Sequence, residues 1–130
     1  MIGNLLAVGI GGMLGALARF GLSSLVARRV GEGFPFATLL VNVVGCLCIG
    51  VLFAWFEQRP EISTQTRLLL STGILGSFTT FSTFGLETIV LAQAGQARLA
   101  LASVAANLLL GLGAVVLGRT LAQAALASGS

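Results

Sequence analysis

The chain has 130 residues, of which 56% are hydrophobic and 8% are charged, and its mean hydropathy is +1.03. Soluble domains carry about 25% charged residues, so this composition excludes an ordinary water-soluble domain and indicates a protein whose solvent is lipid. The net charge of +3 comes from scattered arginines, which favours contact with lipid headgroups and gives no reason to expect a nucleic acid partner.

Four apolar segments are long enough to cross a bilayer as helices, for which about 20 residues suffice. They cover residues 4–27, 35–56, 67–93 and 99–122, and the short connections between them hold most of the charges. The sequence therefore predicts one integral membrane domain, residues 1–130, of the all-α class with four transmembrane helices.

Small residues form stripes along the first and fourth segments. Gly11, Gly15 and Ala18 share one face of the first. The fourth carries Ser103, Asn107, Gly111, Ala114 and Gly118 at spacings of four, four, three and four. Close helix packing is the expected role of the glycines. Ser103 and Asn107 either join helices by hydrogen bonds or line a polar path, because polar side chains are costly in hydrocarbon.

The second segment carries a polar face of its own. Thr38, Asn42 and Gly45 lie one turn apart on the same side of a helix. Asn42 falls near the centre of this segment, and its amide brings N–H donors to a region where few others exist.

The third segment contains a weak stretch of helix between residues 73 and 87, with sequence GILGSFTTFSTFGLE. Glycine frees the backbone, and serine and threonine bond to it in non-helical conformations. Helices broken at the membrane midplane commonly mark ion sites. We therefore expect this helix to be broken near mid-membrane; the alternative is an intact helix whose hydroxyls bond to their own preceding turns.

The same stretch contains an acidic side chain and aromatic side chains. Glu87 is the only carboxylate within a predicted span, and Thr80, Thr83 and Glu87 would form one stripe of an unbroken helix. This polar stripe predicts a hydrated path that leads to one face of the membrane. The alternative is that Glu87 lies at the membrane interface and is solvated there. Phe81 and Phe84 share a face, and the electropositive edges of two phenyl rings suit a small desolvated anion.

The arginines give almost no orientation signal. One side of the membrane would hold Arg28, Arg29 and Arg98, with Arg19 close by, and the other side would hold Arg59, Arg67 and Arg119. The positive-inside rule then allows two readings. Either the chain inserts both ways and opposed copies form an antiparallel dual-topology homodimer, or one loop dominates and the orientation is single.

The chain lacks three residue types that catalytic sites often use, namely histidine, lysine and tyrosine. It has no histidine, so a Ser–His–Asp triad is impossible and a His-based metal site has no ligands. The glycine run at residues 9–12 lacks the spacing of a nucleotide loop. We therefore do not expect an enzyme.

The pattern Gly-x-x-Gly-x-x-Thr-Thr-Phe-Ser-Thr-Phe-x-x-Glu, here Gly73 to Glu87, closely resembles the signature of the bacterial fluoride channels. Residues 11–20, 38–45 and 111–118 resemble the first, second and fourth helices of the same family, so the resemblance covers nearly the whole chain. It implies an antiparallel homodimer in the bacterial inner membrane that lets fluoride leave the cytoplasm passively.

The resemblance also assigns roles to residues. The residues it places along the fluoride pore are Asn42, Phe81, Ser82, Thr83, Phe84 and Glu87, with Ser103 and Asn107 on the pore side of the fourth helix. Arg19 corresponds to an arginine near the vestibule. The backbone carbonyls of Gly76 and Thr79 correspond to a structural sodium site, where the ion is required but not transported.

Two other classes of protein fit the composition. A small multidrug-type antiporter is also short and four-spanning, but needs a carboxylate in its first helix, where this chain has none. A purely structural membrane subunit leaves the polar cluster of residues 79–87 without a role.

Overall fold

The computed structural model describes residues 1–31 and 33–128, and within those ranges it contains helices and no strand. Three helices are continuous, α1 (Ile2–Val30), α2 (Phe36–Gln58) and α6 (Ala97–Ser128). The segment between α2 and α6 consists of α3 (Thr64–Arg67), the π-helix η1 (Leu68–Leu75), α4 (Gly76–Phe78) and α5 (Phe81–Gln93).

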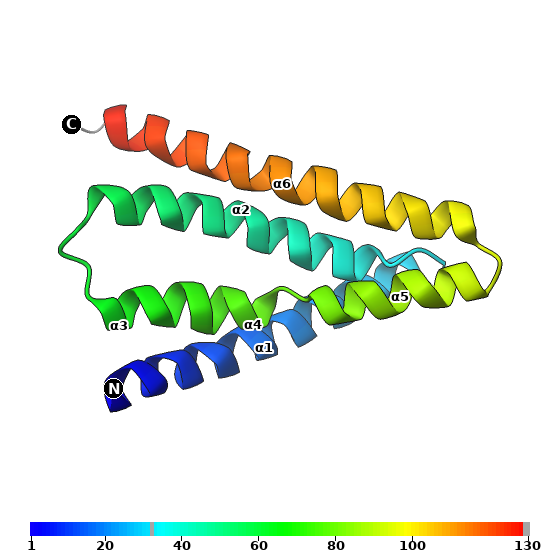
Figure 1. Cartoon of the computed structure of the whole chain (residues 1–130), viewed down its shortest axis with the longest axis horizontal. Coiled ribbons are helices and arrows are strands. Elements are labelled where there is room, and N and C mark those ends of the chain that lie inside the picture. The colour runs from blue at the N-terminus through cyan, green and yellow to red at the C-terminus, as the bar shows by residue number, and fades with distance from the viewer. Residues whose placement is uncertain (32, 129–130) are drawn as a thin grey trace.

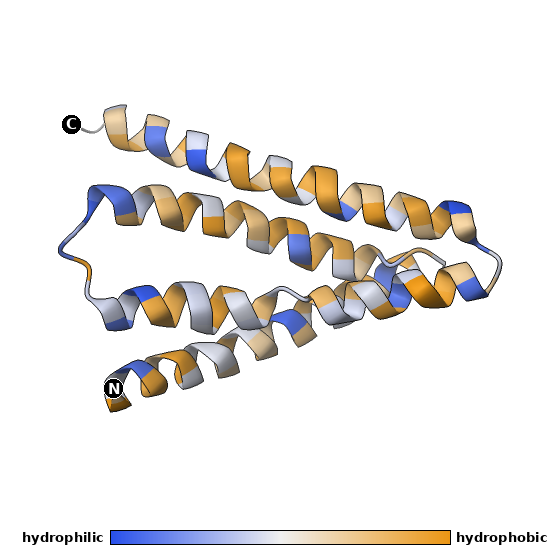
Figure 2. Ribbon diagram, viewed as in Figure 1, coloured by the Kyte–Doolittle hydropathy of each residue, from blue (hydrophilic) through white to orange (hydrophobic). Residues whose placement is uncertain are grey.

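All four predicted spans are present as helical segments long and apolar enough to cross a membrane. This confirms the prediction of an all-α fold with four such segments. Most of their ends lie a few residues beyond the predicted limits, because a helix can continue past the apolar part of its sequence into polar surroundings. Figure 2 shows this distribution, with hydrophilic residues at the ends and connections and at a few positions within the helices, and apolar residues along much of the rest of the helices.

Helices α2 and α6 lie side by side and run in the same direction (Figure 1). Glycines let their backbones touch: a Cβ atom at Gly50 would clash with the carbonyl oxygen of Val115, and one at Gly118 with that of Leu47. Gly111, Ala114 and Gly118 are buried. The small-residue stripe of the fourth segment therefore does what was predicted for its glycines, which is to permit close packing.

Helix α1 packs against η1 through a second glycine contact. Gly11 and Gly15 are buried; a Cβ atom on Gly11 would clash with the Leu69 carbonyl oxygen, and one on Gly15 with that of Ile74. Ala18, the third member of the predicted stripe, is exposed. Helix α1 thus packs against η1, which precedes α4 and the two non-helical residues between α4 and α5, Thr79 and Thr80.

Replacing Gly15 by alanine should lower the free energy of unfolding by about 1–3 kcal/mol, because the added methyl group must push α1 away from η1. Unfolding in detergent, followed by circular dichroism, measures the change. The matched control is Gly9→Ala on the same helix, where an added Cβ meets no atom within 4 Å, and this variant should keep or slightly gain stability. Equal losses in both variants would contradict the packing role of Gly15.

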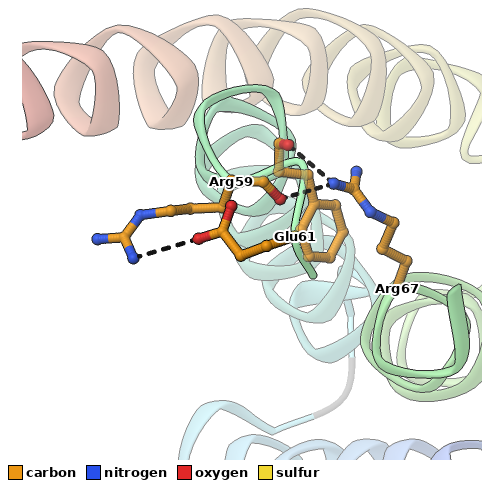
Figure 3. Close-up of polar contacts among 4 residues, drawn as sticks. Arg59, Glu61 and Arg67 are labelled. Carbon is orange, nitrogen blue, oxygen red and sulfur yellow. Dashed lines mark hydrogen bonds and ion pairs between the residues drawn. The ribbon is translucent and has the colours of Figure 1, made fainter. Parts of the chain in front are cut away.

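Arg67 ties the C-terminal end of α2 to the start of the third segment (Figure 3). Its Nη2 donates to the carbonyl oxygens of Phe56 (3.0 Å) and Arg59 (2.9 Å), and its Nε to that of Ile62 (3.3 Å). The guanidinium also lies 4.8 Å from the centre of the Phe56 ring. Carbonyls at a helix C-terminus lack partners within the helix. Those of Phe56 and Arg59 each accept one N–H group of the connection, from Arg59 and Ile62, and Arg67 adds a second bond to each of them while fixing the connection. The neighbouring Arg59–Glu61 ion pair is exposed.

The π-helix η1 is a feature that the sequence pattern did not predict. Its wider turns show at its end, where the Gly76 N–H donates to the carbonyl oxygen of Ser71, five residues earlier. Stretches of π-helix are rare and frequently occur at functional sites. Here η1 ends directly before α4 and the interruption.

Candidate functional site

The backbone leaves the helical conformation for two residues between α4 and α5. Thr79 has φ −77° and ψ 159°, and Thr80 has φ −148° and ψ 113°, both extended. Thr80 caps α5, since its Oγ1 accepts the Thr83 N–H at 3.2 Å. The local cause is the run of hydroxyl residues, which offers the backbone partners other than the helical ones. An unbroken helix would have placed Thr80 within the predicted stripe of Thr80, Thr83 and Glu87. Thr80 instead lies just before α5 as its N-cap.

The amide of Asn42, on α2, holds this interruption. Its Oδ1 accepts the Thr80 N–H at 2.9 Å, and its Nδ2 donates to the Thr80 carbonyl oxygen at 3.1 Å. One side chain thus replaces both helical partners of Thr80, which is buried. Buried backbone groups without partners raise the free energy of the folded state. By pairing both backbone groups of Thr80, Asn42 stabilises the extended conformation at this position.

The second hydrogen of Asn42 Nδ2 is also used. It is donated to Asn107 Oδ1 on α6 at 3.0 Å, and Asn107 Nδ2 donates in turn to the Ser103 carbonyl oxygen at 3.0 Å. The sequence predicted Asn42 as a source of donors for an anion. In this structure both of its N–H bonds already have acceptors, so an anion receives one only by displacing Asn107 or the Thr80 carbonyl.

Gly45, one turn beyond Asn42, makes room for the interruption. A Cβ atom there would clash with the Thr79 methyl group and lie 3.4 Å from the Phe78 ring. At the other end of the same face, Thr38 Oγ1 donates to Glu87 Oε1 at 2.9 Å. The predicted polar face of the second segment therefore meets the third segment along its length.

A groove of about 390 Å³ opens beside the interruption. It is lined by Asn42, Gly45, Cys46, Ile49, Ser71, Leu75, Gly76, Thr79, Thr80, Phe81, Phe84, Asn107 and Leu108. The groove gathers four of the predicted pore residues, Asn42, Phe81, Phe84 and Asn107, and both residues of the predicted sodium site. Ser82, Thr83, Glu87 and Ser103 do not line it.

The two phenyl rings at the start of α5 form a pair. Their centres are 5.5 Å apart and their planes are inclined by 56°. Phe81 is 82% exposed on the surface of the single chain, and Phe84 is partly buried. An apolar ring with so little cover within its own chain is free to contact an ion, a lipid or a second copy.

The hydroxyl groups of Ser82 and Thr83 lie between the two phenylalanines in the sequence. Thr80 Oγ1 donates to Thr83 Oγ1 at 2.9 Å, which leaves the Thr83 hydroxyl hydrogen without an acceptor among the described residues. Ser82 is exposed and forms no hydrogen bond through its side chain within residues 1–31 and 33–128. Both hydroxyls therefore have hydrogens to offer an anion.

Two buried side-chain oxygens, Glu87 Oε2 and Ser103 Oγ, have no hydrogen-bond partner in the described part of the chain. Ser103 is completely buried. Residues of α2 face those 65 positions later on α6, as in the Asn42–Asn107 bond and the Gly50–Val115 contact, and this register places Ser103 level with Thr38. Unpaired buried polar atoms require an explanation, and a bound water molecule at each of the two atoms is one that their chemistry allows.

The carbonyl groups of Gly76 and Thr79 fit the sodium site that the resemblance implies. In a continuous helix they would accept the N–H groups of Thr80 and Thr83. Those N–H groups donate instead to Asn42 Oδ1 and Thr80 Oγ1. The interruption thus leaves two carbonyl oxygens beside the groove, and oxygen is the ligand that hard cations prefer.

Arg19 lies outside this arrangement. It is partly buried on α1, does not line the groove, and forms no hydrogen bond or ion pair with another described residue. Conversely, Ser71 and Cys46 line the groove although neither was a predicted site residue. Ser71 donates to the Arg67 carbonyl oxygen at 2.6 Å, and the adjacent hydroxyl residues Ser71 and Thr72 within the otherwise apolar run of residues 68–75 were the available signal.

The chain is similar to proteins of one family. Residues 6–119 match the family described as CrcB-like protein, Camphor Resistance (CrcB). Proteins named fluoride-specific ion channel FluC are 46% identical over 112 residues in Azotobacter vinelandii, covering 86% of this chain and 90% of the relative, and 42% identical over 120 residues in Ruminiclostridium cellulolyticum, covering 92% of each. The relative from Dehalococcoides mccartyi strain CBDB1 is 40% identical over 117 residues, or 90% of each chain. Helices that can span a membrane and this agreement along the sequence lead to one conclusion: the chain is a multi-pass membrane protein and belongs to the CrcB-like family.

Proposed function

We propose that this protein is a fluoride-specific channel that lets fluoride leave the cytoplasm passively and so lowers its toxicity. The observation that carries the proposal is the interrupted helix between α4 and α5, which Asn42 holds open beside a pair of phenyl rings. The names of the relatives agree with it. The placement in a bacterial inner membrane belongs to the same proposal.

Fluoride gives up a strongly bound water shell on entering a narrow path, so the protein must offer replacement donors. The ring edges of Phe81 and Phe84 and the free hydroxyl hydrogens of Ser82 and Thr83 are available without breaking any bond described above. Asn42 adds a donor when fluoride takes the place of Asn107 Oδ1, the exchange that leaves the Thr80 carbonyl paired. Larger halides fit such a path less well and gain less from its donors.

The working unit of the proposal is an antiparallel homodimer. Two observations support it: the exposed face that carries Phe81, and the nearly equal numbers of arginines on the two sides of the membrane. Carbonyl groups of Gly76 and Thr79 from both copies would hold the structural sodium ion. When bound, sodium supplies a fixed positive charge and joins the two copies, while the groups of each chain handle fluoride.

Fluoride release from liposomes containing the purified protein tests the function. A fluoride electrode should record rapid release, and a parallel chloride measurement should record none. Preparations made with potassium in place of sodium should lose this release if the structural ion is required. Absence of fluoride release from folded protein in sodium would overturn the proposal, and proton-coupled efflux of cations would favour the antiporter.

A further inference from the structure

A second groove, of about 610 Å³, lies away from the candidate fluoride site. It runs between the last turns of α1 and the first turns of α2 and reaches α6, and its lining includes Val26, Leu39, Leu40, Val43 and Leu110. The two grooves share no residue, because α2 presents Leu39, Leu40 and Val43 to one and Asn42, Gly45 and Cys46 to the other. The volume falls within the roughly 300–1,000 Å³ typical of ligand sites.

Arg29 is the single charged residue among those that line this groove. It is exposed in the last turn of α1 and forms no hydrogen bond or ion pair with another described residue. An arginine at the end of a membrane helix lies at the level of the lipid headgroups, and its planar guanidinium binds a phosphate through two parallel hydrogen bonds. The groove therefore combines an apolar channel with a phosphate-binding group at its mouth.

We propose that this groove is a binding site for an acidic phospholipid, with an acyl chain between α1 and α2 and the headgroup phosphate on Arg29. Charge complementarity selects this occupant: an apolar segment of a second copy would leave the guanidinium without an anion, and a zwitterionic lipid carries its own cation beside the phosphate. The site requires only that the chain lies in a membrane, and does not depend on the proposed fluoride function.

The adjacent Arg28 provides a matched control, because it has the same charge and lies in the same last turn of α1 but does not line the groove. Purified wild-type protein, Arg29→Gln and Arg28→Gln are each mixed in detergent with phosphatidylglycerol or with phosphatidylcholine of the same acyl chains. Native mass spectrometry then counts the lipids that each protein retains. Wild type and Arg28→Gln should prefer phosphatidylglycerol, whereas Arg29→Gln should bind it roughly fivefold more weakly.

The apolar part of the site has its own test. Leu40→Trp fills the groove without changing any charge, and should also reduce retention of phosphatidylglycerol while circular dichroism and elution volume stay normal. Equal losses in the two arginine variants would indicate diffuse attraction and overturn the proposal. No preference for phosphatidylglycerol in wild type, as when a second copy covers the groove, would overturn it, and so would full retention by Leu40→Trp.

Discussion

Replacing Phe81 or Phe84 by isoleucine should reduce fluoride release from liposomes by about tenfold or more, which corresponds to a loss of about 1.4 kcal/mol of barrier stabilisation. Isoleucine keeps an apolar side chain but removes the electropositive ring edge that we propose contacts fluoride. Phe81 is 82% exposed within the chain, so little core packing is lost and the variant should fold. The measurement is the initial rate of release, read with the fluoride electrode.

Phe20→Ile is the matched control for the ring substitutions. Phe20 lies on α1, is 74% exposed and does not line the groove at the interrupted helix. This variant should release fluoride at the wild-type rate. Normal release by both Phe81→Ile and Phe84→Ile would reject the role of the rings, whereas equal losses in all three variants would point to a general effect on the membrane-embedded fold.

Replacing Asn42 by alanine should lower the free energy of unfolding by about 2–5 kcal/mol and remove most of the flux. The substitution deletes both partners of the Thr80 backbone and leaves a buried N–H and C=O unpaired, each at a cost of about 1–3 kcal/mol. Denaturation in detergent measures the stability. Hydrogen exchange at the Thr80 amide, which should become faster, measures the specific loss of its acceptor.

Asn107→Ala separates the support of the backbone from the rest of the amide network. It removes the acceptor of one Asn42 hydrogen but leaves both bonds between Asn42 and Thr80 in place. The expected loss is therefore smaller, about 1 kcal/mol, with little change in exchange at Thr80. If Asn107→Ala destabilises the protein as much as Asn42→Ala does, Asn42 is not the main support of the interruption.

The amide of Asn42 mainly stabilises the extended Thr79–Thr80 backbone, and its remaining N–H is donated to Asn107. In the channel that we propose, fluoride would therefore compete with Asn107 for the one N–H that does not bind Thr80. Binding of fluoride would then be an exchange of acceptors, which would keep Asn42 paired before and after the ion passes and avoid the cost of a buried unpaired donor.

The sequence alone determined the class of the protein and the location of its weak point. Runs of apolar residues of membrane-spanning length predicted four helical segments, because backbone groups in lipid must be paired within the helix itself. The density of glycine and hydroxyl residues between positions 73 and 87 marked where helical pairing would fail. The motif in that stretch also pointed to the family. All of these are local properties, readable within one turn or one segment.

Only the tertiary structure decided how the weak point is stabilised. The bonds from Asn42 join residues 38 and 65 positions apart, and no local pattern specifies which turn of α2 meets which residue of α5 or α6. The same holds for the burial of Ser103 and for the three carbonyls that Arg67 joins. Whether a polar side chain in a membrane helix supports the backbone or serves an ion depends on which unpaired groups the packing of the other helices brings within its reach.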